Sequence, residues 1–445
     1  MSFELHMDRS YYRTRSFYIK HRKGVLSNNG NIIANGLPVF MHEYAHLIQD
    51  QYSVYGVIDF FYFIDTLHEI IRLMGKNKFI YYGPLYDQPD ANDCWLTQLE
   101  RLRSAARAHE KWARGILTFE DSEIRDIRIT YKQETIDIPQ VIGKFINPCT
   151  GTEYQHPIGV VEICEAYSMA VENIYNHQKT ATLDEHSEFE YYAVERMLNK
   201  IGIIDSQSII VICHWALQDH FPGKRLYELY NLLSEQKRKM SAYEIYDLCR
   251  GWINQKRFQC DINFYDQKFK DVISHHQGSA GEDDLLVKSI KWYHENAISN
   301  LRKLLDKNSY FPLDTCFAQA PPQTSLASSL DNLFQTCPLP QVEDHQGYIY
   351  SLGTSDSSDF VFLIRSLSYL LSELWYGSSN EFGCKLYKSC TLSIKNDDCL
   401  SAPLNKKFDT SKVTSGIPEK QNICPYGLAL SYMRIAEIAK TEKSK

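Results

Sequence analysis

The chain has 445 residues, which is enough for two or three domains, and its 44% hydrophobic and 23% charged residues are the composition of an ordinary globular protein. The net charge is −7 and no long lysine and arginine run occurs, which excludes an extended phosphate-binding surface, so we expect no nucleic-acid partner. The sequence shows no signal-peptide pattern, and its most apolar stretches are too short and too charged to span a bilayer. We therefore expect no membrane partner and a cytoplasmic location.

In chain order, the sequence predicts an α+β protein that is mostly α-helical. Residues 1–36 alternate loosely between apolar and polar side chains and contain Asn-Gly turn signals, so we expect a small N-terminal sheet there. A helix should begin at Pro38, because the missing N–H of proline costs nothing in the first turn, and should end near Tyr55, before Gly56. A second helix is expected over residues 59–75.

The later segments are predicted from the same patterns. Residues 124–139 alternate β-branched and polar side chains, which predicts a strand or hairpin, and residues 147–159 are rich in turn-forming residues. Apolar residues at helical spacing predict further helices over residues 94–117, 160–178, 190–202, 208–221, 224–239, 283–307, 359–377 and 426–440.

Changes in composition indicate where the chain divides. Residues 311–347 are rich in proline, serine and glutamine, which predicts a linker or long loop. We therefore expect one domain with a helical extension over residues 1–310 and a helical, cysteine-containing segment over residues 348–445.

The most specific motif lies in the first predicted helix. His42 and His46 are four residues apart, so on a helix both imidazoles project from one face at the spacing at which they can share a metal ion. Glu43 follows His42 directly, where it can reach a water on that ion and act as a general base. Gln49 lies on the same face, where its amide can hold one of the histidines in place. The pattern predicts a zinc site.

The same pattern can also arise by chance. In a chain with 15 histidines, an accidental H-E-x-x-H has a probability of roughly a few per cent. His68 and Glu69 repeat half of the motif, but Arg72 stands where the second histidine would be. Under this alternative the helix is an ordinary buried amphipathic helix.

A catalytic zinc needs a third protein ligand, and no histidine follows His46 closely, so we expect a carboxylate from another helix. The predicted helix over residues 160–178 offers Glu162, Glu165 and Glu172. We choose Glu165, because it is surrounded by apolar residues and an inward-facing glutamate is costly unless a metal or a cation pairs with it. Glu172 lies seven residues later on the same face and is a candidate partner for a ligand histidine. The alternative is that all three belong to a solvated face.

The stretch "HEYAHLIQD", followed much later by "GVVEICEAYSMAVE", resembles the gluzincin branch of the HExxH zinc metallopeptidases. In that branch a glutamate on a downstream helix completes a two-histidine site. The resemblance implies a zincin-like core within residues 1–310 and a Zn²⁺ cofactor held by His42, His46 and Glu165. It also implies that Glu43 is the general base for hydrolysis of a protein or peptide substrate. An endopeptidase is favoured over an exopeptidase.

Several questions stay open at the level of sequence. The protein could instead be an interaction scaffold that has kept the zinc fold without turnover, or a helical binding protein with an accidental motif. The sequence shows no pro-segment, so restraint of a protease by a regulatory protein partner also stays open. The group that would stabilise the oxyanion is undecided among Tyr154, His156, Tyr167 and His214.

Two other groups of residues are candidates for a metal site. Cys384, Cys390, Cys399 and Cys424 could bind a second zinc, but no C-x-x-C pair occurs among them, so ordinary thiols are favoured. The adjacent His275 and His276 are expected in a loop, since neighbouring residues cannot share one helix face.

Overall fold

The computed structural model describes residues 11–13, 18–27, 32–77, 117–131, 134–176, 191–236, 238–253, 255–280, 285–304, 310–316, 341–346, 349–351 and 363–368. These residues form a mostly helical protein with two small sheets, so the predicted α+β class is confirmed. None of the helices in the described ranges is long and apolar enough to cross a bilayer. The predicted helix over residues 94–117, except for its last residue, the predicted helix over residues 426–440 and the four C-terminal cysteines fall outside these ranges.

The helices are α1 (Leu37–Gln51), α2 (Val54–Asn77), α4 (Val160–Tyr175), α5 (Ala193–Lys200), α6 (Ser206–Ala216), α7 (Pro222–Ser234), α8 (Ala242–Trp252), α9 (Gln255–Ala280), α10 (Leu285–Leu304) and the short α11 (Leu313–Cys316). A 3₁₀ turn over Ala34–Gly36 precedes α1. The strands are β1 (Tyr11–Arg13), β2 (Tyr18–Lys20), β3 (Thr118–Tyr131), β4 (Glu134–Ile146), β5 (Glu153–Ile158), β6 (Gln341–Glu343) and β7 (Ile349–Ser351).

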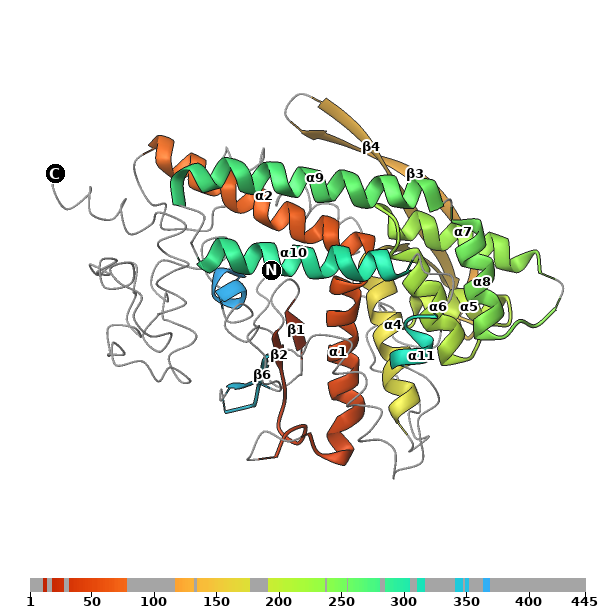
Figure 1. The fold of residues 1–445 in the computed structure, drawn as a ribbon. Coiled ribbons are helices and arrows are strands. Elements are labelled where there is room, and N and C mark those ends of the chain that lie inside the picture. The colour runs from red at the N-terminus through yellow and green to blue at the C-terminus, as the bar shows by residue number, and fades with distance from the viewer. Residues whose placement is uncertain are drawn as a thin grey trace.

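Helices α1 and α4 form the centre of the molecule and lie side by side (Figure 1). Both bury most of their apolar residues, and the hydrophobic core runs through the pair without a break. Helices α2, α9 and α10 pack together across one end of α1, and α5 to α8 gather beside α4 (Figure 1). The helix with His42 and His46 and the helix with Glu165 are therefore neighbours, as the choice of Glu165 for the third ligand requires.

The first helix ends earlier than the sequence predicts, at Gln51 instead of near Tyr55, and α2 already begins at Val54. Tertiary hydrogen bonds satisfy backbone groups that this early break leaves without a helical partner. The buried Gln218, on the segment after α6, accepts from the Val54 amide and donates to the Tyr52 carbonyl. Gly56 then lies inside α2, where a Cβ would come within 2.2 Å of a backbone oxygen of α1. Gly56 thus permits close helix packing and does not end a helix.

The predicted strand or hairpin over residues 124–139 is correct in type but extends much further in both directions. β3 and β4 pair antiparallel along almost their whole length, and β4 also pairs with β5, which gives a sheet of order β3-β4-β5. The turn end of the hairpin projects past the helices at the top of Figure 1. β5 lies in the stretch predicted to be rich in turns, and it leads through Gly159 directly into α4.

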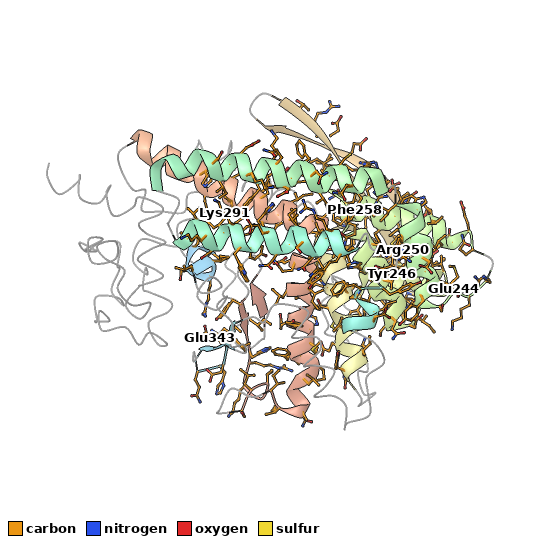
Figure 2. The ribbon with its side chains drawn as sticks, in the orientation of Figure 1. Glu244, Tyr246, Arg250, Phe258, Lys291 and Glu343 are labelled. Atoms are coloured by element: carbon orange, nitrogen blue, oxygen red, sulfur yellow. The ribbon has the colours of Figure 1, made fainter. Side chains whose placement is uncertain are left out.

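The predicted N-terminal sheet exists, but half of it comes from the C-terminal part of the chain. β2 pairs with β1 and, in parallel, with β6, which lies inside the stretch predicted to be a linker or long loop. Glu343 on β6 binds Lys20 and the fully buried Arg365 and accepts a hydrogen bond from the Tyr18 hydroxyl, and Figure 2 shows Glu343 beside this sheet. The predicted division into residues 1–310, 311–347 and 348–445 remains a prediction.

Three helices were not predicted: α8, α9 and the short α11, which lies in the stretch predicted to be a linker or long loop. α8 begins with a capping box in which Ser241 and Glu244 bond each other's backbone amides, and this S-x-x-E signal is visible in the sequence. α9 continues through His275 and His276, so the predicted loop at that point is wrong. A 26-residue helix that packs on α2 and α10 gains enough burial along its length to tolerate a glycine near its end.

Candidate metal centre

The antiparallel packing of α1 and α4 brings the predicted site residues together. Gln49 contacts Cys164, His46 contacts Glu165, and His42 contacts both Glu165 and Glu172. Residues nearer the C-terminus of α1 therefore contact residues nearer the N-terminus of α4. Each helix presents its polar residues at a spacing of three or four, which keeps them on the shared face. The site therefore depends on the packing of two helices that are more than a hundred residues apart.

Three donor atoms converge on one point. Glu165 Oε2 lies 3.3 Å from His42 Nε2 and 3.5 Å from His46 Nε2, and the three ligand atoms all lie within 4.8 Å of one another. In a tetrahedral zinc site with bonds of about 2.0–2.1 Å, neighbouring ligand atoms are about 3.3–3.4 Å apart. Two imidazole nitrogens and one carboxylate oxygen at these separations fit a zinc ion.

The other nitrogen of the His46 ring is held by Gln49. Gln49 Nε2 donates to the Cys164 carbonyl at 2.9 Å and to Ser168 Oγ at 3.2 Å, so the amide oxygen is the atom that faces His46 Nδ1 at 3.0 Å. An amide oxygen can only accept, so the neutral His46 ring carries its proton on Nδ1 and its lone pair on Nε2. Gln49 thus fixes the tautomer that a metal requires.

The His42 ring is held by a charged group. Glu172 Oε2 lies 3.1 Å from His42 Nδ1 but away from the direction of the ring N–H, so the contact is an ion pair and not an aligned hydrogen bond. Gln49 and Glu172 were both predicted as supporting residues, and they contact different histidines. Gln49 contacts His46 through a neutral amide, and Glu172 contacts His42 through a carboxylate.

The imidazoles and carboxylates of the cluster shift each other's pKa values. Burial alone would lower the pKa of His42, but the carboxylates of Glu165 and Glu172 outweigh it and raise the pKa to about 10. Burial would also lower the pKa of His46, but Glu165 outweighs it and raises that pKa. Burial would raise the pKa of Glu165, but the two imidazoles hold it far below its usual range. The pocket thus favours positive charge, supplied either by protons or by a cation.

Glu43, the predicted general base, is buried beside this cluster with 6% of its surface exposed. Its negative charge contributes to the raised pKa of both His42 and His46, which places it within electrostatic reach of both rings.

Glu162, His156 and His214 contact other groups. Glu162, the alternative third ligand, caps the start of α4 and bonds His156 at 3.0 Å, with both side chains 1% exposed. His214 packs between Trp215 and Phe311, where burial lowers its pKa to about 3.

Tyr191 contacts the site although no sequence motif marks it. Tyr191 lies just before α5, and its ring centroid is 6.1 Å from that of His42. Tyr191 therefore joins the candidates for oxyanion stabilisation. Ser168 is also part of the site, since its hydroxyl lies 3.3 Å from His46 Nδ1. Helical spacing placed Ser168 between Glu165 and Glu172, but only the packing of α4 on α1 defines its contact.

Comparison of the chain with protein-family models, with curated proteins and with solved structures found no match.

Proposed function

We propose that this protein is a zinc-dependent metallopeptidase of the gluzincin type, with a zincin-like core built around α1 and α4. It would hydrolyse peptide bonds in a protein or peptide substrate, as an endopeptidase in preference to an exopeptidase. The observation that carries this proposal is the cluster of His42, His46 and Glu165, in which Glu165 Oε2 lies near the tetrahedral separation from both Nε2 atoms and Glu43 lies beside them.

The residues divide the chemistry among them. When bound, zinc would polarise the substrate carbonyl and lower the pKa of the attacking water. Glu43 would take the proton from that water and deliver it to the leaving amine. Gln49 and Glu172 would keep the two imidazoles aimed at the metal, which matters because small displacements of catalytic groups cost large factors in rate.

The first experiment tests the metal. Purified protein should contain about one zinc per chain, and His46→Ala should lose it, because two ligands alone rarely retain zinc against a chelator. His220→Ala is a matched control, since His220 lies outside the cluster and bonds Tyr265. Equal zinc content in wild type and His46→Ala would exclude this site.

The second experiment separates an enzyme from a scaffold. Glu43→Gln is nearly isosteric but cannot accept a proton, so it should keep zinc and the fold while hydrolysis falls by about 10²-fold or more. Wild type and variant are incubated with whole-cell lysate, and new protein N-termini are identified by mass spectrometry. Glu195→Gln on α5 is the control and should behave like wild type. New N-termini that are equally abundant with Glu43→Gln would refute the proposed base and leave the scaffold as the better hypothesis.

A further inference from the structure

The β3 strand has an open edge. In the sheet order β3-β4-β5, β3 pairs with β4 on one side and, within the described residues, with no strand on the other. α5 lies against the start of β3, and a bulge between Phe119 and Asp121 interrupts the strand there. Beyond the bulge, β3 pairs regularly with β4 from Asp121 to Tyr131, and the turn end of the hairpin projects past the helices (Figure 1).

The two residues beside Ile124 on this edge are charged. Ile124 is 38% exposed, and the side chains of Glu123 and Arg125 on either side of it are 37% and 49% exposed. Charges on an edge strand usually prevent pairing with other chains. Here they alternate in sign around an exposed isoleucine, so their effect depends on which strand is placed opposite.

The alternation is complementary to itself in two registers, one around Ile124 and one around Ile127. Residues directly opposite each other in an antiparallel pair share a face, so a two-fold axis through the edge must pass beside a single residue of β3. An axis beside Glu123, Arg125 or Asp126 places two like charges opposite each other. An axis beside Ile127 places Asp126 against Arg128 twice, but it leaves Glu123 and Arg125 without an opposite charge, and the side chain of Ile127 is less exposed than that of Ile124. An axis beside Ile124 places Ile124 against itself and Glu123 against Arg125 twice.

We propose that β3 pairs antiparallel around Ile124 with β3 of a second copy of this chain, joining the two three-stranded sheets into one of six strands. Two Glu123–Arg125 contacts lie on one face of the joined sheet, and the two Ile124 side chains meet on the other. Each Glu123 already lies 2.6 Å from its own Arg125 and 3.3 Å from Lys144, so the interface extends an existing charge cluster. A short strand pair buries little surface, which makes this a weak dimer that forms at micromolar concentrations or above.

The test uses two charge variants of the full-length protein and their mixture, measured by sedimentation equilibrium. Arg125→Glu faces Glu123 with glutamate, and Glu123→Arg faces Arg125 with arginine, so each variant alone should dimerise about tenfold to a hundredfold more weakly than wild type. In a 1:1 mixture every pair of opposed charges is complementary again, so a heterodimer should form as in wild type. Lys268→Glu, an exposed change on α9, should leave dimerisation unaltered.

Each outcome bears on the proposal. Circular dichroism and the melting temperature confirm that each variant is folded. A monomeric wild type at the highest attainable concentration would overturn the proposal, and so would dimers that both single variants retain. A wild-type dimer that neither variant forms, alone or mixed, would overturn the register around Ile124.

Discussion

Replacing Gln49 by leucine should weaken both the fold and metal binding, because this one side chain links α1, α4 and a ligand histidine. Its amide oxygen faces His46 Nδ1 at 3.0 Å, and its amide nitrogen donates to Cys164 at 2.9 Å and to Ser168 at 3.2 Å. Gln49 is 5% exposed, so water cannot freely replace these partners.

The size of the effect follows from these contacts. Three hydrogen bonds at about 0.5–1.5 kcal/mol each give an upper limit of about 4.5 kcal/mol. Part of this is recovered, because Ser168 Oγ lies 3.3 Å from His46 Nδ1 and the Cys164 carbonyl keeps its place in the helix ladder. We expect a loss of about 2–3 kcal/mol in the free energy of unfolding. Metal affinity should fall about 10–100-fold, as is usual when the partner of a ligand histidine is removed.

Urea unfolding of the metal-free protein measures the first quantity, and competition with a chelator measures the second. Gln49→Glu separates the two roles, because it keeps an oxygen for His46 but loses both donors to α4. Gln267→Leu on the exposed face of α9 is the control and should change stability by less than about 0.5 kcal/mol. Unchanged stability and unchanged metal affinity in Gln49→Leu would refute the inference that this residue holds the site.

The remaining predictions concern charge and burial. The pKa of His42 is raised to about 10 in the metal-free protein, so a proton must leave this ring when a metal binds. The affinity for the metal should therefore rise about tenfold per pH unit between about pH 6 and pH 8. A metal affinity that does not change with pH, measured by chelator competition, would contradict this. Gln51 is fully buried, and within the described residues neither polar atom of its amide has a hydrogen-bond partner, so Gln51→Met should stabilise the fold by about 1 kcal/mol or more in urea unfolding, and a loss would count against this account. Glu343→Gln removes the carboxylate that binds the buried Arg365 and should cost about 3–5 kcal/mol, whereas a change below about 1 kcal/mol would show that the pair does not hold the N-terminal sheet.

The sequence alone determined the features that depend on residues close together in the chain. The four-residue spacing of His42 and His46 requires only that the segment be helical, and local signals set the start of that helix. The mostly helical class follows from apolar spacing in the same way. Glu165 could be chosen because a carboxylate among apolar neighbours is costly without a partner, and that argument too needs only its own helix.

Tertiary structure decided what depends on contacts between distant segments. The early end of α1 depends on Gln218, which lies on the segment after α6 and supplies hydrogen bonds that no local signal reveals. The N-terminal sheet depends on β6, whose three residues carry too little pattern to be recognised and whose Glu343 binds Lys20 and Arg365. Glu165 faces both Nε2 atoms, whereas Glu172 faces His42 Nδ1. The position of α4 along the axis of α1 decides this difference. Spacing within one helix defines which residues share a face, but only packing between helices defines which atoms meet.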